Sequence, residues 1–259
     1  MVQQDAVQQD MVRESMAPEK QINEFLSRLR RAAGENLESV ILYGSAAGGE
    51  FHPEFSNVNL LCVLGETSFA RLSALAPAVA WWNRHKHPAP LVLTRQELER
   101  SADVFAIEWL DMQQRHRVLF GDDPLPGLHI PMNLHRAQVE YELREKLILL
   151  RERILLAAGN QNRLWDLLLG SLPSFATLFR HALIALGGPA VDSKRAGLEE
   201  LSRRIPFDAS AFGQLLDIRE RKRTRHQLDV SDTFTRYLAA IEQVAAAVDT
   251  MLDSTGSRE

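Results

Sequence analysis

The sequence predicts an α+β protein in which a mixed-sheet domain is followed by an all-helical domain. Two observations predict it. Short apolar and β-branched runs alternate with helical patterns up to about residue 130, and only helical patterns follow. We therefore expect a disordered polar tail over residues 1–17, a mixed domain over 18–130 and a helical bundle over 131–259.

The first domain begins with a helix followed by two strands. Apolar residues recur at helical spacing over 19–33, and Gly34 marks the end of that pattern. The run 38–42 is rich in β-branched and apolar residues and the run 58–64 is mostly apolar, which predicts two buried strands. A Gly-Ser pair at 44–45 ends the first of them and predicts a tight turn.

The remainder of this domain is expected to alternate in the same way. A helix, interrupted or bent at Pro77, is predicted over 67–86, followed by a short strand over 91–93. Thr94 with Glu97 forms a capping box, which predicts a helix start. The run 104–110 is expected to be extended.

The second domain carries five helical patterns with short connections, which predicts a bundle. The expected helices cover residue 133 to the Gly159-Asn160 pair, 163–186 with a bend or break at Pro173, 193–204, 209–221 and 232–251. Its core is expected to contain Val139, Leu143, Leu147, Leu150, Phe175, Phe179 and Phe234.

Composition indicates a globular chain of 259 residues that lies in the cytoplasm. The net charge of −4 provides no general attraction to nucleic acid or anionic membranes. The one cysteine, Cys62, lies within an apolar strand and is expected to be a buried, inert thiol. No segment reads as a membrane span, and the first residues lack a signal-peptide pattern.

The Gly44-Ser45 pair, the gap of eleven residues and the following Asn57-Val58-Asn59 strand resemble the nucleotidyltransferase superfamily, with its polymerase-β-like fold. Kanamycin nucleotidyltransferases belong to it. The resemblance covers roughly residues 20–125 and includes 103–111 and 118–124. It implies a nucleotide site at Gly44, Ser45, Asn57 and Asn59.

Members of that superfamily carry Asp-x-Asp where this chain has Asn57 and Asn59. Two carboxylates on alternate strand positions hold the Mg²⁺ ions that bridge the nucleotide phosphates. Asparagine supplies an oxygen but no negative charge, and Mg²⁺ in proteins is usually held by one or two carboxylates. A third acid is also absent from 91–93. No catalytic residue, metal ligand or cofactor is therefore assigned, and the resemblance implies Mg²⁺ and NTP only for an active enzyme.

Each candidate residue also has a structural interpretation. Gly44 and Ser45 either cradle a triphosphate or form an inherited turn, and the two asparagines bind either a ligand or neighbouring backbone. Glu50 and Glu54 could replace lost ligands, or they are solvated loop carboxylates.

Three further groups of residues also have a structural interpretation. Glu108 and Asp111, three residues apart, would point to opposite sides of an extended segment, so we expect no paired acid–base role for them. His85 and His87, beside Trp81-Trp82, are expected at a helix end with partly buried tryptophans rather than in a metal site.

The basic run 219–226 contains Arg221 and His226, a spacing that resembles that of helical HEPN ribonucleases. A solvated basic helix end is the expected structure. A phosphate or RNA contact is the alternative.

The sequence thus predicts a catalytically degenerate nucleotidyltransferase-fold protein that binds a nucleotide or a protein partner. Homo-oligomerisation through the helical domain is one form of such partnering. The first alternative is an active metal-dependent enzyme that transfers a nucleoside monophosphate from NTP to a small molecule or protein hydroxyl. The second is a toxin–antitoxin-type protein whose helical domain contacts RNA.

Overall fold

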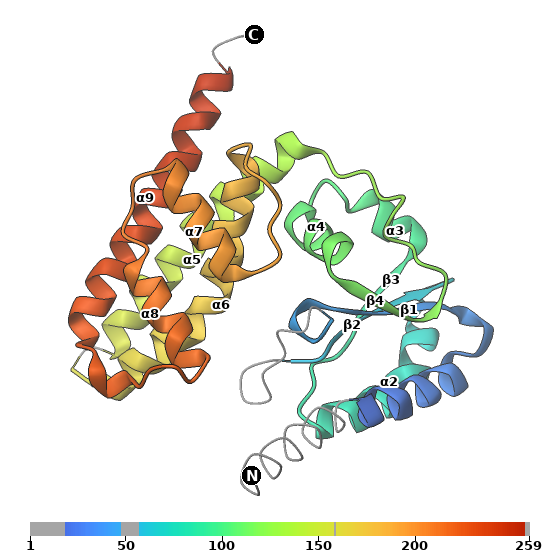
Figure 1. Cartoon of the computed structure of the whole chain (residues 1–259). Coiled ribbons are helices and arrows are strands. Elements are labelled where there is room, and N and C mark those ends of the chain that lie inside the picture. Colours follow the sequence, from blue (N-terminus) through green and yellow to red (C-terminus); the bar gives the residue numbers. More distant parts are fainter. Residues whose placement is uncertain (1–18, 48–56, 158, 257–259) are drawn as a thin grey trace, which may run out of the picture. The chain divides into compact units, whose positions relative to one another are not determined.

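The computed structural model describes residues 19–47, 57–157 and 159–256, and it divides into two compact units, residues 1–130 and 131–259 (Figure 1). Glu50 and Glu54 lie outside the described residues, as does the expected tail over 1–17.

Unit 1 is built on a four-stranded mixed sheet with the strand order β3-β2-β1-β4. The strands are β1 (Leu37–Tyr43), β2 (Asn59–Leu64), β3 (Leu91–Thr94) and β4 (His116–Gly121). β1 is antiparallel to both β2 and β4, and β2 is parallel to β3. The expected mixed sheet is confirmed, and β1 occupies a central position between strands that follow it in sequence.

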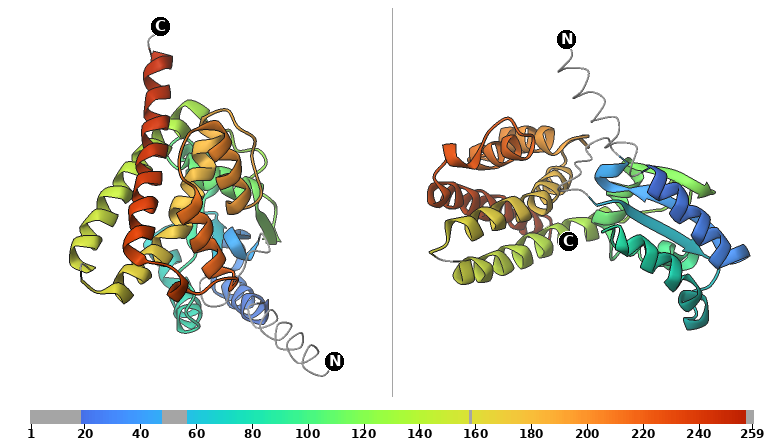
Figure 2. Two further views of the ribbon diagram at one scale, coloured as in Figure 1. Left: turned by 60° about the vertical axis from the view of Figure 1, so that its left-hand side comes forward. Right: turned by 90° about the horizontal axis from the view of Figure 1, so that it is seen from below.

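Helices cover both faces of this sheet (Figures 1 and 2). A helix over 19–33 and α2 (Phe69–Arg84) lie on one face, and α3 (Arg95–Arg100) and α4 (Ala106–Gln114) lie on the other. Because β2 is buried on both sides, its sequence is apolar without alternation.

Alternate residues of β2 enter two different cores. Val58, Leu60, Cys62 and Leu64 pack with the helix over 19–33 and with α2, whereas Leu61 and Val63 pack with α3 and α4. Because side chains alternate along a strand, the position of a polar residue in β2 decides which of the two cores it faces.

One expectation for unit 1 is wrong. The run expected to be extended over 104–110 is mostly helical, because α4 begins at Ala106 and buries Trp109 and Met112 against the sheet. The chain then forms β4, which pairs with β1 and which the sequence analysis did not assign. α2 also continues through Pro77, which lies on the exposed side of the helix.

The start of α3 has the predicted capping box. The Thr94 hydroxyl accepts a hydrogen bond from the Glu97 amide at 3.1 Å, and the Glu97 carboxylate accepts one from the Thr94 amide at 2.7 Å. The predicted capping box is confirmed.

Unit 2 consists of five α-helices with short connections, as predicted. They are α5 (Met132–Ala157), α6 (Gln161–Ala185), α7 (Lys194–Arg204), α8 (Ser210–Arg219) and α9 (Val230–Gly256), with the short 3₁₀ turn η3 (Arg225–Gln227) before α9. α6 is continuous through Pro173, so the helix is not broken there.

The predicted core of unit 2 is confirmed. All seven apolar residues expected there are at most 8% exposed: Val139, Leu143, Leu147, Leu150, Phe175, Phe179 and Phe234. Aromatic rings join three of the helices, since Phe212 of α8 stacks on Tyr237 of α9 at 4.4 Å and on Phe179 of α6 at 4.5 Å between ring centroids.

α6 corrects the expectation that no segment is apolar enough for a membrane span. By length and composition it could cross a membrane, although much of its most apolar window is buried inside the protein. Arg180 and His181 are buried within the same helix. An apolar helix at the centre of a bundle has the same composition as a membrane span, and this is the reason for the discrepancy.

Candidate functional site

The candidate site begins at the turn that ends β1. After Tyr43 the chain enters the short 3₁₀ turn η2 (Gly44–Ala46), closed by a hydrogen bond from the Ala47 amide to the Gly44 carbonyl at 3.0 Å. Gly44 has φ of +77°, a left-handed conformation that a residue with a Cβ adopts only with strain. The glycine of the Gly-Ser pair is thus required by the backbone itself.

Asn59 lies directly against this turn. It is the first residue of β2 and pairs in register with Tyr43, the residue before Gly44. A Cβ on Gly44 would lie 3.2 Å from the Asn59 Nδ2 atom, so the glycine also leaves room for the amide. The structure brings the turn and Asn59 together, as the sequence predicted.

Asn57 lies two residues before Asn59 and is exposed, while Asn59 is half-buried. β2 begins at Asn59, so Asn57 precedes the strand and does not share it with Asn59, in contrast to the sequence prediction. Asn59 pairs with Tyr43, which packs toward α3 and α4, so Asn59 belongs to that side of the sheet.

Tyr43 and Glu108 add two groups that the sequence analysis did not place here. Tyr43 packs against the core beneath α3 and α4. Burial raises the pKa of the Tyr43 phenol, and the negative charge of Glu108 on α4 raises it further. The charge of Glu108 on the covering helix thus acts on the Tyr43 phenol.

The helical conformation of α4 also changes the relation between Glu108 and Asp111. Three residues apart on a helix, they lie on neighbouring positions of one face, not on opposite sides as an extended segment would place them. The reason given against a paired role therefore does not apply. Both residues make further interactions, and no role is assigned to the pair on this geometry alone.

His116 is a second neighbour of the site that the sequence analysis missed. It begins β4 and pairs with Tyr43 on the side of β1 opposite to Asn59, so that these three residues form one row across the sheet. Its Nδ1 lies 2.7 Å from the Met112 carbonyl oxygen and its Nε2 lies 2.8 Å from a carboxylate oxygen of Asp123. The available signal was the short run 117–120 before Gly121, which has strand composition.

The donor set does not fit Mg²⁺. Asn57 and Asn59 offer uncharged amides, and β3 contributes the apolar Leu91 and Leu93. Within the residues that the structure describes, no three His, Cys, Asp or Glu side chains are grouped so that they could hold a metal ion. Mg²⁺ prefers carboxylate and phosphate oxygens, and the carboxylate of Asp123 is already engaged by His116.

The surroundings of His87 and Cys62 agree with their structural interpretations. Trp82 is buried and stacks on Phe25 at 4.5 Å between ring centroids. The His87 Nε2 atom lies 2.7 Å from the Gln21 side-chain oxygen, and desolvation lowers the pKa of His87. Cys62 is buried, and burial raises its thiol pKa to about 12.

The basic run 219–226 is not a continuous helix end. Arg219 ends α8 and turns inward, where Nη1 donates a hydrogen bond to the Leu169 carbonyl at 3.1 Å. Arg221 has φ of +58° in the turn that follows, and His226 lies in η3. The expected solvated helix end is therefore only partly correct, and an RNA contact stays a prediction.

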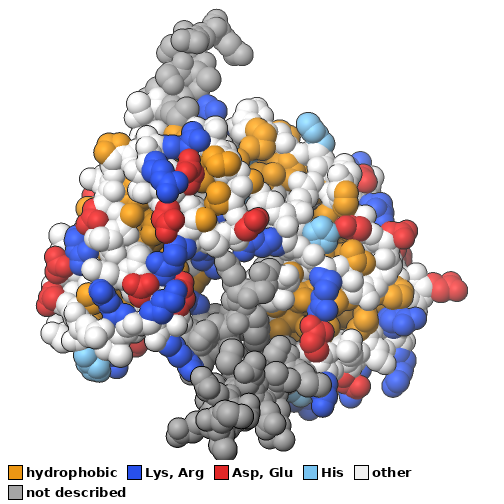
Figure 3. All heavy atoms as spheres, in the orientation of Figure 1, with side chains coloured by type: hydrophobic (Ala, Val, Ile, Leu, Met, Phe, Trp, Pro, Cys, Tyr) orange, Lys and Arg blue, Asp and Glu red, His pale blue; other side chains and the backbone are white. Residues whose placement is uncertain are grey.

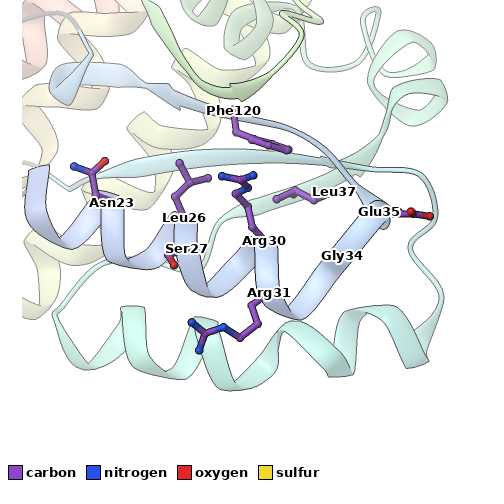
Figure 4. A pocket seen from close by; sticks show the side chains of 9 residues that line it. All are labelled: Asn23, Leu26, Ser27, Arg30, Arg31, Gly34, Glu35, Leu37 and Phe120. Carbon is purple, nitrogen blue, oxygen red and sulfur yellow. The ribbon is translucent and has the colours of Figure 1, made fainter.

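A groove of about 640 Å³ lies elsewhere in unit 1, between the helix over 19–33 and β4 (Figure 4). The Arg30 guanidinium lies over the Phe120 ring in it, 4.7 Å from the ring centroid. Phe120 packs with the core of the helix over 19–33 and α2, so this groove belongs to the other face of the sheet from Asn59. Acidic and basic side chains are interspersed over the face of the molecule drawn in Figure 3.

The mixed sheet with helices on both faces, followed by a helical unit, is the nucleotidyltransferase fold. A solved structure of spectinomycin adenyltransferase AAD(9) from Enterococcus faecialis, determined with ATP and spectinomycin, is similar to this chain with a TM-score of 0.57. The alignment covers 89% of this chain and 98% of that one at 15% sequence identity. No family model matches the sequence, and no curated protein does. At this identity the likeness establishes the fold.

Proposed function

We propose that this protein binds a nucleotide beside the Gly44 turn and does not transfer nucleotides. The observation that carries the proposal is the position of the Asn59 amide beside the turn, where a Cβ on Gly44 would lie 3.2 Å from Asn59 Nδ2. Gly44 has the left-handed conformation that a phosphate-binding turn would use, while the position that bears a metal-binding aspartate in the superfamily that the chain resembles carries an amide.

The turn has the geometry to bind phosphate. A left-handed residue followed by right-handed ones directs successive backbone N–H groups to one side, and such concave arrangements bind anions. Ser45 is half-buried in this turn and adds a hydroxyl group. Asn59 at the start of β2, and Asn57 two residues before it, would donate amide hydrogens to phosphate or base.

Transfer is not expected, because two negative charges are replaced by neutral amides. At an effective dielectric constant near 20, two opposite unit charges about 4 Å apart attract each other by about 4 kcal/mol. Mg²⁺ carries two charges, so its attraction to each carboxylate is about twice as large. A site without these charges holds the metal too weakly to neutralise the phosphates during transfer.

The proposal is tested by calorimetric titration of ATP, GTP and UTP with Mg²⁺ and with EDTA. ATP is the first choice because the similar adenyltransferase was solved with it. We expect binding that depends little on Mg²⁺ and that is lost in Ser45→Trp. Ser73→Trp, at an exposed position of α2, is the matched control and is expected to bind like the wild type.

An active transferase is the second candidate, and the approach of Glu108 to Tyr43 favours it. In that case the wild type releases pyrophosphate from an NTP with Mg²⁺ or Mn²⁺, and Glu108→Gln abolishes the release. Spectinomycin, other aminocyclitols and the protein itself are the acceptors to supply. Turnover of this kind would contradict the proposal of a binding protein.

A further inference from the structure

The groove between the helix over 19–33 and β4 lies outside the proposed nucleotide site. Its floor is apolar and consists of Leu26, Leu37 and Phe120. The Arg30 side chain rises from the helix toward this floor, and its guanidinium lies over the Phe120 ring (Figure 4). The ring covers one face of the planar cation, so that the N–H groups at its rim can donate hydrogen bonds to a carboxylate.

The groove is positively charged. Arg30 and Arg31 both line it, both are exposed, and neither forms an ion pair with an acid that the structure describes. Among the described residues that line the groove, Glu35 is the one acid. The whole chain has a net charge of −4, so the groove differs in sign from the protein as a whole. A ligand that carries carboxylates complements this local charge.

The strand beside the groove is the outer strand of the sheet. β4 pairs with β1 on one side, and the order β3-β2-β1-β4 leaves the other side of β4 without a strand. Within the part of the chain that the structure describes, the residues from Arg117 to Gly121 form no backbone hydrogen bonds besides those with β1. The outward peptide groups of such a strand can pair with a further extended chain.

Two side chains of β4 point to the groove side of the sheet. Arg117 pairs with Leu42 and Phe120 pairs with Val40, and both partners belong to the core beside the helix over 19–33. The register shifts between these two pairs, so Leu119 is an extra residue in β4. The bulge limits pairing at this edge to a short segment on either side of it.

A second copy of the protein does not suit this edge. If two β4 strands paired about a two-fold axis perpendicular to the sheet, both helices over 19–33 would lie on the same face of the joined sheet. Arg30 and Arg31 of one copy would then face the same arginines of the other. A bulge and an arginine within an outer strand are also features by which proteins prevent pairing between copies.

The length of the groove fits a short extended segment. Asn23 and Gly34, eleven positions apart on or next to the helix, both line it. At 1.5 Å per residue the helix covers about 16 Å over this distance. An extended chain advances about 3.3 Å per residue, so about five residues span the groove.

We propose that the groove and the outer edge of β4 bind an extended acidic segment of a partner protein. The backbone of the segment pairs with β4 beside the bulge, and alternate side chains enter the groove, where a carboxylate accepts hydrogen bonds from Arg30. The groove is on the other face of the sheet from Asn59, so this proposal does not depend on the nucleotide site.

The observations favour a peptide over a single-stranded nucleic acid. Nucleic acid strands bind to grooves in which several aromatic side chains stack on successive bases. Among the described residues that line this groove, Phe120 is the one aromatic residue, and Arg30 lies over its ring. The outward peptide groups of β4 match the backbone of another peptide instead.

The first test measures binding of a fluorescein-labelled pentapeptide, Val-Glu-Val-Glu-Val, to the full-length protein by fluorescence anisotropy. The two glutamates are two residues apart and therefore lie on one side of an extended chain. We expect saturable binding below about 300 µM, and affinity about tenfold lower for the same peptide with glutamine in place of both glutamates.

Variants of the protein assign the binding to the groove. Arg30→Gln should lower the affinity for the glutamate peptide about fivefold, because one exposed charge pair is lost. Arg153→Gln removes an exposed arginine of α5 in unit 2 and is the matched control, which should bind like the wild type. Thermal unfolding of each variant reports whether it is folded.

Methylation of the peptide backbone tests strand pairing. The N–H groups of an extended chain point alternately to its two edges, and only one edge of the peptide faces β4. One isomer is N-methylated at the second and fourth residues and the other at the third and fifth. We expect one isomer to bind about tenfold more weakly than the parent peptide and the other to bind like it.

Absence of binding at about 300 µM, equal affinity of the glutamate and glutamine peptides, or unchanged affinity in Arg30→Gln overturns the proposal. Two methylated isomers that both bind like the parent overturn the pairing with β4. An oligouridylate of about ten nucleotides that binds in place of the peptide and is lost in Arg30→Gln would assign the groove to nucleic acid. A wild-type dimer in sedimentation equilibrium that the glutamate peptide dissociates would assign the edge to a second copy. Either result would also overturn the proposal.

Discussion

Replacing Gly44 with alanine tests the turn on which the proposed nucleotide site depends. The substitution has two costs. Alanine at φ of +77° is strained by roughly 1–2 kcal/mol, and the new Cβ lies 3.2 Å from the Asn59 Nδ2 atom. The second contact is tight enough to displace the amide by a few tenths of an ångström, but it does not prevent folding.

Gly34→Ala separates the two costs. Gly34 has φ of +57°, and a Cβ there would meet no atom within 4 Å, so this variant has only the backbone strain. We expect each variant to lose about 1–2 kcal/mol of the free energy of unfolding. Only Gly44→Ala should also weaken nucleotide binding, by about tenfold if one hydrogen bond of the Asn59 amide to a charged phosphate is lost.

Unfolding in urea is followed by tryptophan fluorescence, since three of the four tryptophans, Trp81, Trp82 and Trp109, lie in unit 1. Affinity is measured by calorimetry with ATP at a temperature where both variants are folded. Equal affinity in Gly44→Ala and the wild type would refute the proposed site. Equal loss in Gly34→Ala would show that the effect is one of stability.

Three further variants or conditions test the fold. Leu147→Ala should destabilise unit 2 by about 2–5 kcal/mol, whereas the control Glu199→Ala, on the exposed side of α7, should cost less than about 0.5 kcal/mol. A change below about 0.5 kcal/mol for Leu147→Ala in urea unfolding would contradict the place of Leu147 in the core. Gly121→Ala would place a Cβ 1.8 Å from the Glu38 carbonyl oxygen, so β4 should separate from β1. Hydrogen exchange of the β4 amides that stays as slow as in the wild type would contradict this separation. Burial raises the Cys62 pKa to about 12, so the unfolded thiol ionises near pH 9 while the folded one stays protonated. The free energy of unfolding should therefore fall by about 1.4 kcal/mol per pH unit between pH 9 and 12, and a Cys62→Ala variant should lack this contribution.

Much of the fold could be predicted because local patterns and tertiary structure agree. The stripe Val139, Leu143, Leu147 and Leu150 has helical spacing and is buried on one side of α5. Thr94 caps α3 through contacts only three residues apart. Such signals need no knowledge of distant segments.

The errors arose where distant segments decide the structure. The residues before Trp109 form a short apolar run, which periodicity alone does not assign to helix or strand, and packing of Trp109 and Met112 beneath the helix decides it. β4 exists because Phe120 pairs with Val40, eighty residues earlier in the chain. α2 continues through Pro77 because the neighbouring Leu75 and Ala78 are buried against the sheet.

The site was predicted only where a resemblance supplied its pattern. The spacing between Gly44 and Asn59 indicated a turn beside a strand, and the structure brings these residues together. The approach of Glu108 to Tyr43 could not be predicted, because it depends on the helical conformation of α4 and on how α4 packs on the sheet.

The most direct test compares ATP binding and transfer in the wild type with those in the Asn57→Asp, Asn59→Asp double variant. Affinity is titrated with Mg²⁺ and with EDTA, and radiolabelled ATP is followed for release of pyrophosphate. We predict that the wild-type affinity changes less than about threefold with Mg²⁺, that the double variant gains Mg²⁺-dependent affinity, and that the wild type releases no pyrophosphate. Mg²⁺-dependent pyrophosphate release by the wild type that Ser45→Trp abolishes would contradict the proposed function.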